Sequence, residues 1–344
     1  MTVNVLCDRH HAGLYHSLEL LGDRLGWDLW TPVGEEWFAQ EYWSFGREHF
    51  GRELVDQFLV IGDAAWQRWM PATSEGAWAR IDREYPDREI KGVTLDAARM
   101  MDWDIVMATV QDNQEGFARF AREIGAQYAY QVGNTNQQID WSLDPSALIS
   151  AESPIVGRGI RYHQEMDACY RWHPPAEADR HRIGSFVNLM PRIECWPLMF
   201  EAWQALRPEF SFAIHGHGCP DGVVHPTTAV AETMAGCGWG YHDKVTGDGF
   251  GHVIWGWAAI GRPLIGHASH YRGKLGEVLW RDLGTCIDLD QHTVPEAAQL
   301  IRDISADPDR HAQMCDAMRR TFEAHYDPER DARAIRTLLA RGAA

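Results

Sequence analysis

A glycine-rich loop that leads into an apolar helix constrains this chain of 344 residues more than any other feature. The loop reads Val245-Thr-Gly-Asp-Gly-Phe-Gly251, the helical pattern covers 252–260, and a turn at Gly261-Arg-Pro263 opens an apolar strand. Glycines let the backbone bend and approach a ligand closely. The first N–H groups of a helix lack partners within the helix and lie at the positive end of its dipole. The segment therefore predicts an anion site, with a phosphate-bearing ligand as the first hypothesis.

Short apolar runs alternate with helical patterns through most of the remaining chain. A strand, a helix and a strand at the start of the chain predict a parallel sheet with crossover helices. The expected strands are 2–7, 28–31, 104–110, 127–132, 183–188, 210–215, 239–242, 263–266 and 286–289. The expected helices are 13–26, 115–124, 194–206, 227–235, 252–260, 273–281, 294–305, 308–324 and 327–341. Residues 35–91 read as an insertion of loops and short helices, and residues 142–179 contain many turns.

The loop and the strand that follows it resemble the nucleotide-sugar site of group 1 glycosyltransferases with the GT-B fold. That family has an acidic-Gly-Phe-Gly loop, a helix and a Gly-(Lys/Arg)-Pro strand start, and this sequence has Asp248-Gly-Phe-Gly251 and Gly261-Arg-Pro-Leu-Ile265. The family usually places a second Glu eight residues after the first acid, where it binds the donor ribose. Gly256 stands at that position here.

The resemblance implies an α/β chain of two doubly wound Rossmann-like domains that face a central cleft. We expect an acceptor-side domain at 1–178, completed by a C-terminal helix that crosses back at 327–344. We expect a donor-binding domain at 179–326. Ligands of such sheets bind at the carboxyl ends of the strands. The resemblance also implies that no metal is needed to hold the diphosphate of the donor.

Candidate donor-binding residues supply either backbone N–H groups or positive charge. Lys244 precedes the loop, and the family brings a basic residue to the diphosphate after the first strand of this domain, which Arg192 matches loosely. Asp248 is better suited to a sugar hydroxyl or a backbone amide than to a phosphate. Arg272 and Lys274 are secondary cationic candidates. The donor-binding set is Arg192, Lys244, Gly247, Asp248, Gly249, Phe250 and Gly251.

Candidate catalytic residues follow two strands of the first half. His10 and His11 come directly after the first strand, where one of them can deprotonate an acceptor hydroxyl, because the pKa of histidine lies near neutral pH. Asp112 follows the strand 104–110 and can serve as a base or as an anchor for the acceptor. The His215-Gly-His-Gly-Cys219 run has no second cluster with ligand spacing, and we expect no metal site there.

Bulk properties exclude several classes of protein. The net charge of −17 disfavours a broad nucleic-acid surface, because acidic proteins repel phosphate backbones. No apolar run reaches the roughly 20 residues of a membrane span, and the N-terminal residues do not resemble a leader. Seven scattered cysteines without a Cys-x-x-Cys pair indicate reduced thiols and a cytoplasmic protein.

These observations predict an enzyme that transfers a sugar from a nucleotide-diphosphate sugar to an unidentified hydroxyl acceptor without a metal. Two alternatives remain open. One is a nucleotide-sugar epimerase of the same fold, and the other is a non-catalytic protein that binds carbohydrate or nucleotide, which the glycine at position 256 favours.

Overall fold

The computed structural model describes residues 2–45, 68–69, 76–81, 85–152, 158–187, 201, 204–244 and 248–342. The chain forms two compact units, the first made of Met1–Glu165 with Pro328–Ala344 and the second of Met166–Asp327. We expected the first boundary at residue 178, but residues 166–178 belong to the second unit. The reason is hydrogen bonding, since Met166 N donates to Tyr326 Oη (2.8 Å) and His173 N donates to Ile260 O (3.2 Å).

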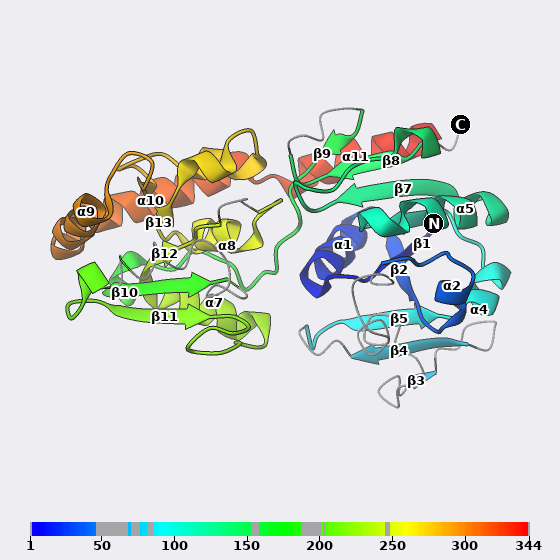
Figure 1. The fold of residues 1–344 in the computed structure, drawn as a ribbon, viewed down its shortest axis with the longest axis horizontal. Coiled ribbons are helices and arrows are strands. Elements are labelled where there is room, and N and C mark those ends of the chain that lie inside the picture. Colours follow the sequence, from blue (N-terminus) through cyan, green and yellow to red (C-terminus); the bar gives the residue numbers. More distant parts are fainter. Residues whose placement is uncertain are drawn as a thin grey trace. The chain divides into compact units, whose positions relative to one another are not determined.

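Unit 1 contains one sheet of nine strands among its described residues, in the order β3-β4-β5-β2-β1-β6-β7-β8-β9. From β5 through β2 and β1 to β9 the pairing is parallel, with Val5 opposite Leu29 of β2 and Ile105 of β6. The strands are β1 (Val3–Cys7), β2 (Trp27–Pro32), β3 (Arg68–Trp69), β4 (Ala77–Ile81), β5 (Glu89–Val93), β6 (Ile105–Ala108), β7 (Gln127–Val132), β8 (Ser146–Ile149) and β9 (Ile160–Arg161). The helices are α1 (Ala12–Leu25), α2 (Glu36–Ala39), α4 (Leu95–Met100), α5 (Gln114–Ile124) and α11 (Pro328–Gly342) (Figure 1).

Both edges of this sheet differ from the expectation. Within the region read as loops and short helices, β3, β4 and β5 pair antiparallel, with a continuous register from Ala77–Val93 to Ile81–Glu89. Within the region read as turns, β8 pairs parallel with β7 and β9. These strands have two to five residues, which is too short for the alternation of apolar and polar residues to stand out.

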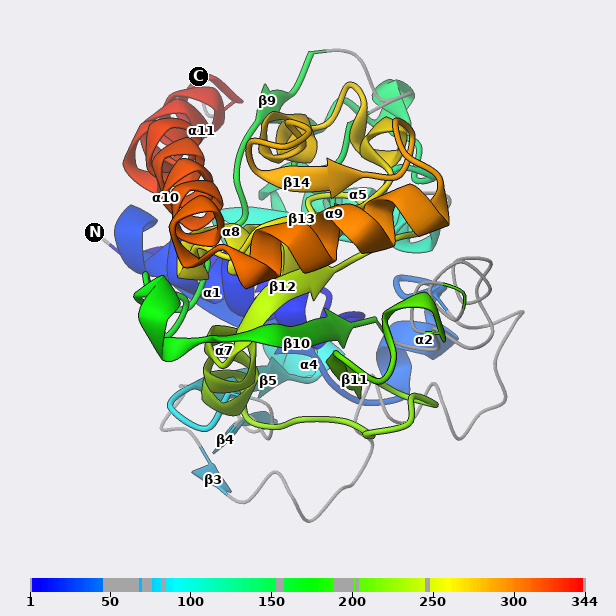
Figure 2. The same cartoon turned by 90° about the vertical axis from the view of Figure 1, so that its left-hand side faces the viewer.

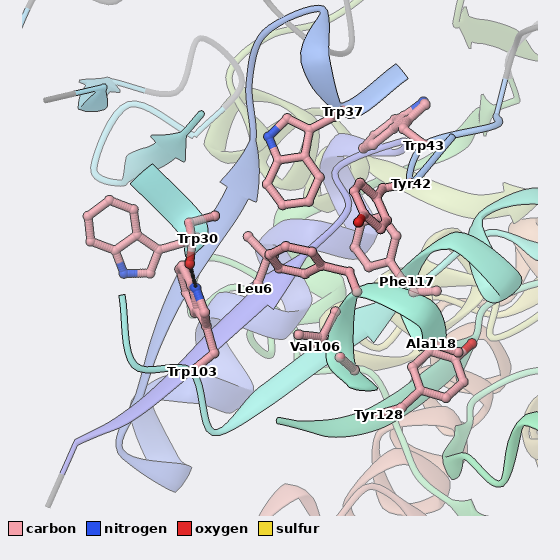
Figure 3. Packing of buried hydrophobic residues seen from close by; sticks show 14 of the residues in the cluster. Leu6, Trp30, Trp37, Tyr42, Trp43, Trp103, Val106, Phe117, Ala118 and Tyr128 are labelled. Carbon is pink, nitrogen blue, oxygen red and sulfur yellow. Dashed lines mark hydrogen bonds between the residues drawn. The ribbon is translucent and has the colours of Figure 1, made fainter. Parts of the chain in front are cut away.

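The core of unit 1 lies on both faces of its sheet, because successive side chains of a strand point to opposite faces. Leu6 and Val106 pack under α2, α4 and α5 with a group of aromatic rings, which Figure 3 shows from close by. Val5 and Ile105 pack on the opposite face against α1 and α11. Through Ile335 and its neighbours, the C-terminal helix completes the first unit, as the sequence predicted.

Unit 2 has a parallel sheet of five strands among its described residues, in the order β11-β10-β12-β13-β14. The strands are β10 (Asp179–Phe186), β11 (Ser211–His215), β12 (Cys237–Tyr241), β13 (Leu264–Gly266) and β14 (Cys286–Asp288). The helices are α7 (Thr227–Ala235), α8 (His252–Ile260), α9 (Val294–Ala306) and α10 (Pro308–His325), and Figure 2 shows α9 lying across one face of this sheet. The helix expected at 273–281 is instead a 3-10 turn, η6 (Leu275–Leu279), and most of the helix expected at 194–206 lies outside the described residues.

Tryptophan supplies much of the packing in both units. Trp239 lies on the face covered by α9, whereas Trp255 and Trp257 lie on the opposite face, which α7, α8 and α10 cover. These three indoles and those of Trp37 and Trp43 in unit 1 have no exposed surface. Tryptophan buries more apolar surface than any other side chain. Packing therefore accounts for these five rings, and none of them can stack on a sugar.

Candidate functional site

The described part of the glycine-rich loop ends at a helix start that no described side chain caps. Gly251 adopts φ +79° directly before α8, a backbone conformation that favours glycine, and a Cβ there would lie 2.9 Å from Ile254 Cγ1. Val245–Gly247 lie outside the described residues, and so does Arg192. Two of the seven predicted donor-binding residues, Gly247 and Arg192, are therefore not placed by the structure.

Asp248 lies at the centre of a charged cluster, which we call the Asp248 cluster and define as His242, Lys244, Asp248 and Lys274. Its carboxylate accepts from His242 Nε2 (2.5 Å) and from Lys244 Nζ, and its carbonyl oxygen accepts from Lys274 Nζ (2.9 Å). Burial alone would raise the pKa of Asp248, but the charges and hydrogen bonds of His242 and Lys244 hold it well below its usual range. His242 and Lys244 therefore engage this carboxylate, and the sugar hydroxyl or backbone amide that the sequence suggested for it stays a prediction.

Two lysines meet in this cluster, although the whole chain contains just three, at positions 91, 244 and 274. Lys244 is 36% exposed, whereas Lys274 is 8% exposed and lies 5.5 Å from the ring centroid of Tyr271. Burial lowers the pKa of Lys274. Within the Asp248 cluster, two ammonium groups therefore face a single carboxylate. Lys274 was a secondary candidate in the sequence, and the structure brings it to Lys244.

Two residues of the Asp-Gly-Phe-Gly and Gly-Arg-Pro motifs, Phe250 and Arg262, have buried side chains that stabilise the fold. The Phe250 ring is 2% exposed and stacks on Trp255 with centroids 5.6 Å apart, so its backbone alone remains for a ligand. The Arg262 guanidinium is fully buried and donates to backbone carbonyls of Cys237, His173 and Ala235, each at 2.8 Å. The Gly-Arg-Pro turn therefore ties α8 to β12 and to the segment before β10.

The glycine at position 256 has a packing explanation. A Cβ at Gly256 would lie 3.1 Å from Cε1 of Tyr170 and 3.5 Å from Met234 Sδ. The 3.1 Å contact is tight, so the Tyr170 ring must shift by a few tenths of an ångström, whereas the 3.5 Å contact is an ordinary van der Waals distance. A glutamate at this position, where the resembling family has its ribose acid, would have to press the Tyr170 ring aside.

In unit 1, His10 belongs to a hydrogen-bonded network at the carboxyl ends of β1 and β6. His10 Nδ1 lies 2.8 Å from Thr109 Oγ1, and the Thr109 hydroxyl donates to Asp8 Oδ1. Because a hydroxyl has one proton, which Asp8 accepts, His10 must donate from Nδ1, and its Nε2 then carries a lone pair. Burial and the neighbouring His11 lower the pKa of His10, which keeps the ring neutral.

Asp8 anchors this network and is 1% exposed. It accepts from Thr109 N (2.8 Å) and from Asn113 Nδ2 (2.7 Å). Burial raises the pKa of Asp8 to about 6, against the opposing effect of the hydrogen bonds from Thr109 and Asn113. Neither Asp8 nor Thr109 was predicted from the sequence to be functional. The available signal was that Asp8 and Thr109 both follow strand patterns whose ends meet at one edge.

The other two candidate catalytic residues lie apart from this network. His11 is exposed, and its Nδ1 accepts from Leu14 N (3.3 Å), so it caps the start of α1. Asp112 lies exposed on the 3-10 turn η1 (Gln111–Asn113). The structure therefore distinguishes a half-buried, neutral His10 from two exposed neighbours.

Comparisons with known proteins bear on the fold. No family model matches this sequence, and no curated protein sequence matches it. The chain is similar in structure to Anabaena HepE in complex with UDP and glucose, with a TM-score of 0.63, 11% identity, and 99% of this chain and 100% of that chain covered. It is also similar to an alpha-glucosyltransferase in complex with UDP and a 13-mer DNA containing an HMU base (TM-score 0.63, 10% identity, 99% of each chain).

A further similar structure is sucrose-phosphate synthase from Thermosynechococcus elongatus, with a TM-score of 0.61, 10% identity and 99% of each chain covered. Within the described residues, no helix is both long and apolar enough to cross a bilayer. Three glycosyltransferase structures thus match this chain over nearly its whole length, and their sequences differ from it at about nine positions in ten. The protein therefore has the two-unit GT-B fold, as the sequence predicted.

Proposed function

We propose that this protein is a glycosyltransferase that moves a sugar from a nucleoside diphosphate sugar to a hydroxyl acceptor. The observation that carries the proposal is the position of Lys244 and Lys274. Two of the chain's three lysines lie at the carboxyl ends of unit 2 strands, beside a helix start. Anions bind at such ends of doubly wound sheets. The likeness to structures that hold UDP supports a diphosphate as the anion.

In this proposal, unit 2 binds the donor. The N–H groups at the start of α8, with Gly249, Phe250 and Gly251 before them, donate to phosphate oxygens. Lys244 turns from Asp248 towards the diphosphate, and Lys274 holds the loop through the carbonyl of Asp248. Arg192 and Gly247 remain candidates for the same ligand.

Unit 1 supplies the acceptor side, with His10 as the base. The acceptor oxygen forms a bond to the anomeric carbon of the sugar, while the bond from that carbon to the phosphate oxygen breaks and its electron pair leaves with the diphosphate. The acceptor proton passes to His10 Nε2. Thr109 and Asp8 hold the tautomer that makes this nitrogen a base.

The test of the donor site uses the three lysines as a matched set. We expect Lys244→Ala and Lys274→Ala each to weaken UDP binding roughly 10–100-fold, the size of a lost charge-assisted hydrogen bond. Lys91→Ala is the control, because Lys91 pairs with Asp28 in unit 1. Titration calorimetry measures the affinity, and circular dichroism confirms that each variant is folded. Equal UDP affinity in all four proteins would refute the donor site.

The hydroxyl acceptor is not identified by the structure, so DNA has to be assayed directly as one candidate. The net charge of −17 argues against a broad DNA surface, but a protein of this fold has been solved with DNA bound. Incubation with UDP-glucose and a panel of hydroxyl acceptors, including DNA, followed by mass spectrometry, separates the alternatives. A glycoside with released UDP supports transfer, an isomerised donor indicates an epimerase, and binding without any product indicates a non-catalytic protein.

A further inference from the structure

Three potential metal ligands meet in unit 2 outside the Asp248 cluster. Asp243 follows β12, His267 follows β13, and His270 lies in the 3-10 turn η5 (Ala268–Tyr271). One ligand atom from each residue lies within 4.8 Å of the others. His267 Nδ1 is 2.9 Å from Asp243 Oδ2, and His270 Nδ1 is 2.9 Å from Asp243 Oδ1. Each imidazole thus faces a different oxygen of one carboxylate.

The carboxylate of this group is buried, and the two imidazoles are partly exposed, so a ligand can reach them from solvent. The Asp243 carboxylate has no exposed surface, whereas His267 is 19% and His270 16% exposed. Asp243 Oδ1 and His270 Nδ1 approach closely but lack hydrogen-bond alignment, and among the described residues neither atom has a hydrogen-bond partner. A buried carboxylate oxygen without a donor is costly. A cation between these groups would satisfy both atoms.

The segment that carries the two histidines is fixed by acidic residues after β14. Asp288 Oδ1 accepts from Ala268 N (3.0 Å), and Asp290 accepts from Ser269 N (2.6 Å) and Ser269 Oγ (2.9 Å). These two acids belong to the sequence Asp288-Leu-Asp290, which matches the Asp-x-Asp pattern of a metal-binding motif. They hold the backbone of η5 in place, which sets the positions of both imidazoles before any ligand arrives.

We propose that Asp243, His267 and His270 form a binding site for a divalent transition metal, of which Zn²⁺ is the representative probe. Two imidazoles and one carboxylate are a donor set that zinc enzymes use with a further position open to water or substrate. Ligand atoms about 2.1 Å from a tetrahedral ion lie roughly 3.4 Å apart. The present 2.9 Å separations need to widen by about half an ångström, which side-chain rotation provides.

This site does not depend on sugar transfer, because its ligands are separate from the Asp248 cluster. Both lie on the same edge of the sheet, since Asp243 is flanked in sequence by His242 and Lys244. A bound divalent ion would add positive charge at this edge, and its open position would accept an oxygen of an anionic ligand. GT-B glycosyltransferases generally need no metal for this purpose, so the site would be a peculiarity of this chain.

Metal titration of the full-length chain without an affinity tag tests the proposal. After dialysis against a chelator, Zn²⁺ is added without any nucleotide, and binding is followed by calorimetry, by metal content after gel filtration and by the melting temperature, which a ligand specific to the native state raises. We expect one ion per chain. His267→Ala and His270→Ala should each weaken binding by more than the roughly 10–100-fold that changes around a metal site cause.

The matched control is His292→Ala. His292 is also 19% exposed, belongs to unit 2 and lies 2.9 Å from a single carboxylate, that of Asp282. This variant should bind Zn²⁺ like the native chain. Retention of native affinity in both His267→Ala and His270→Ala would overturn the proposal, as would the absence of any binding to the native chain. Because both imidazoles are partly exposed, these variants should remain folded, and their circular dichroism spectra verify this.

Discussion

The two units place different chemistry at the carboxyl ends of their parallel strands. Unit 1 has a neutral histidine, a hydroxyl and a buried acid joined by hydrogen bonds. Unit 2 has two ammonium groups around an ionised carboxylate. A neutral imidazole suits proton transfer, whereas clustered cations suit a phosphate. The carboxyl ends of the strands in the two sheets therefore carry different chemistry, and the difference arises from the residues that follow the strands.

Removing the proposed base, His10 of unit 1, should lower activity more than any other change, and it should leave donor binding by unit 2 intact. We expect His10→Ala to lower kcat by about 10²–10⁴-fold, the usual contribution of a positioned base, with UDP affinity unchanged. His11→Ala should remove a helix cap, cost about 1 kcal/mol of stability and leave kcat within a few-fold. Steady-state kinetics with calorimetry measures both quantities.

Asp112→Asn provides the second control for the base, because this exposed acid lies on the same edge of unit 1. We expect its kcat to equal that of the native chain. If Asp112→Asn lost activity and His10→Ala kept it, the assignment of the base would have to move from the buried network to the exposed acid.

The buried acid of unit 1 should appear in the pH dependence of stability. Burial raises the pKa of Asp8 from 3.8 to about 6, so between these values the native state holds a proton that the unfolded state releases. Stability contributed by this group is therefore present below pH 4 and is lost as the pH rises through 6, by up to about 3 kcal/mol. His10 acts in the opposite sense, because its lowered pKa makes the unfolded state take up the extra proton.

Paired variants separate these two opposing contributions. The free energy of unfolding of the native chain minus that of Asp8→Asn should fall between pH 4 and 6, whereas the difference for His10→Ala should rise. Denaturant unfolding at several pH values measures both differences. A flat Asp8→Asn difference would show that this carboxyl titrates normally in the folded state.

Most helices and strands could be predicted from the sequence because the periodicity of apolar residues within a long segment is enough to identify it as a helix or a strand. Helices 227–235 and 252–260 and strand 127–132 have the predicted bounds. The strands β3, β4 and β5 on one side of the sheet were missed because they are defined by pairing with each other and with β2. The expected helix at 273–281 is shortened to the 3-10 turn η6, which follows Gly273 at φ +76° and contains Gly276, whose added Cβ would lie 2.6 Å from Ile254 Cδ1.

The candidate sites were predicted only where their residues are neighbours in sequence. Lys244 and Asp248 were named from the loop, and the structure brings them together, although their role in binding stays a prediction. Thr109 and Asp8 are separated by 101 residues, so no local pattern connects them. The Asp243–His267–His270 group is equally dispersed. Arg262 was named from the sequence as part of the Gly-Arg-Pro motif alone, and the structure shows that its guanidinium is a buried link between backbone carbonyls.

The smallest expected effect concerns the donor unit and the glycine of α8. Alanine at position 256 gains up to about 1 kcal/mol in helix propensity and loses a similar amount by pressing on Tyr170, a half-buried ring that can shift. We therefore expect Gly256→Ala to change stability by less than about 1 kcal/mol and to leave UDP affinity unchanged.

Gly256→Glu introduces the acid that the resembling family uses to bind the donor ribose, and it therefore tests whether that subsite exists in this protein. A glutamate must displace Tyr170, so we expect a loss of about 1–3 kcal/mol of stability and no gain in UDP affinity. Thermal unfolding and calorimetry measure the two outcomes. Tighter UDP binding with unchanged stability would mean that the ribose subsite of the family is preserved and that Tyr170 yields easily. Unchanged affinity would mean instead that donor binding in unit 2 depends on the two lysines and the start of α8, without an acid on the helix.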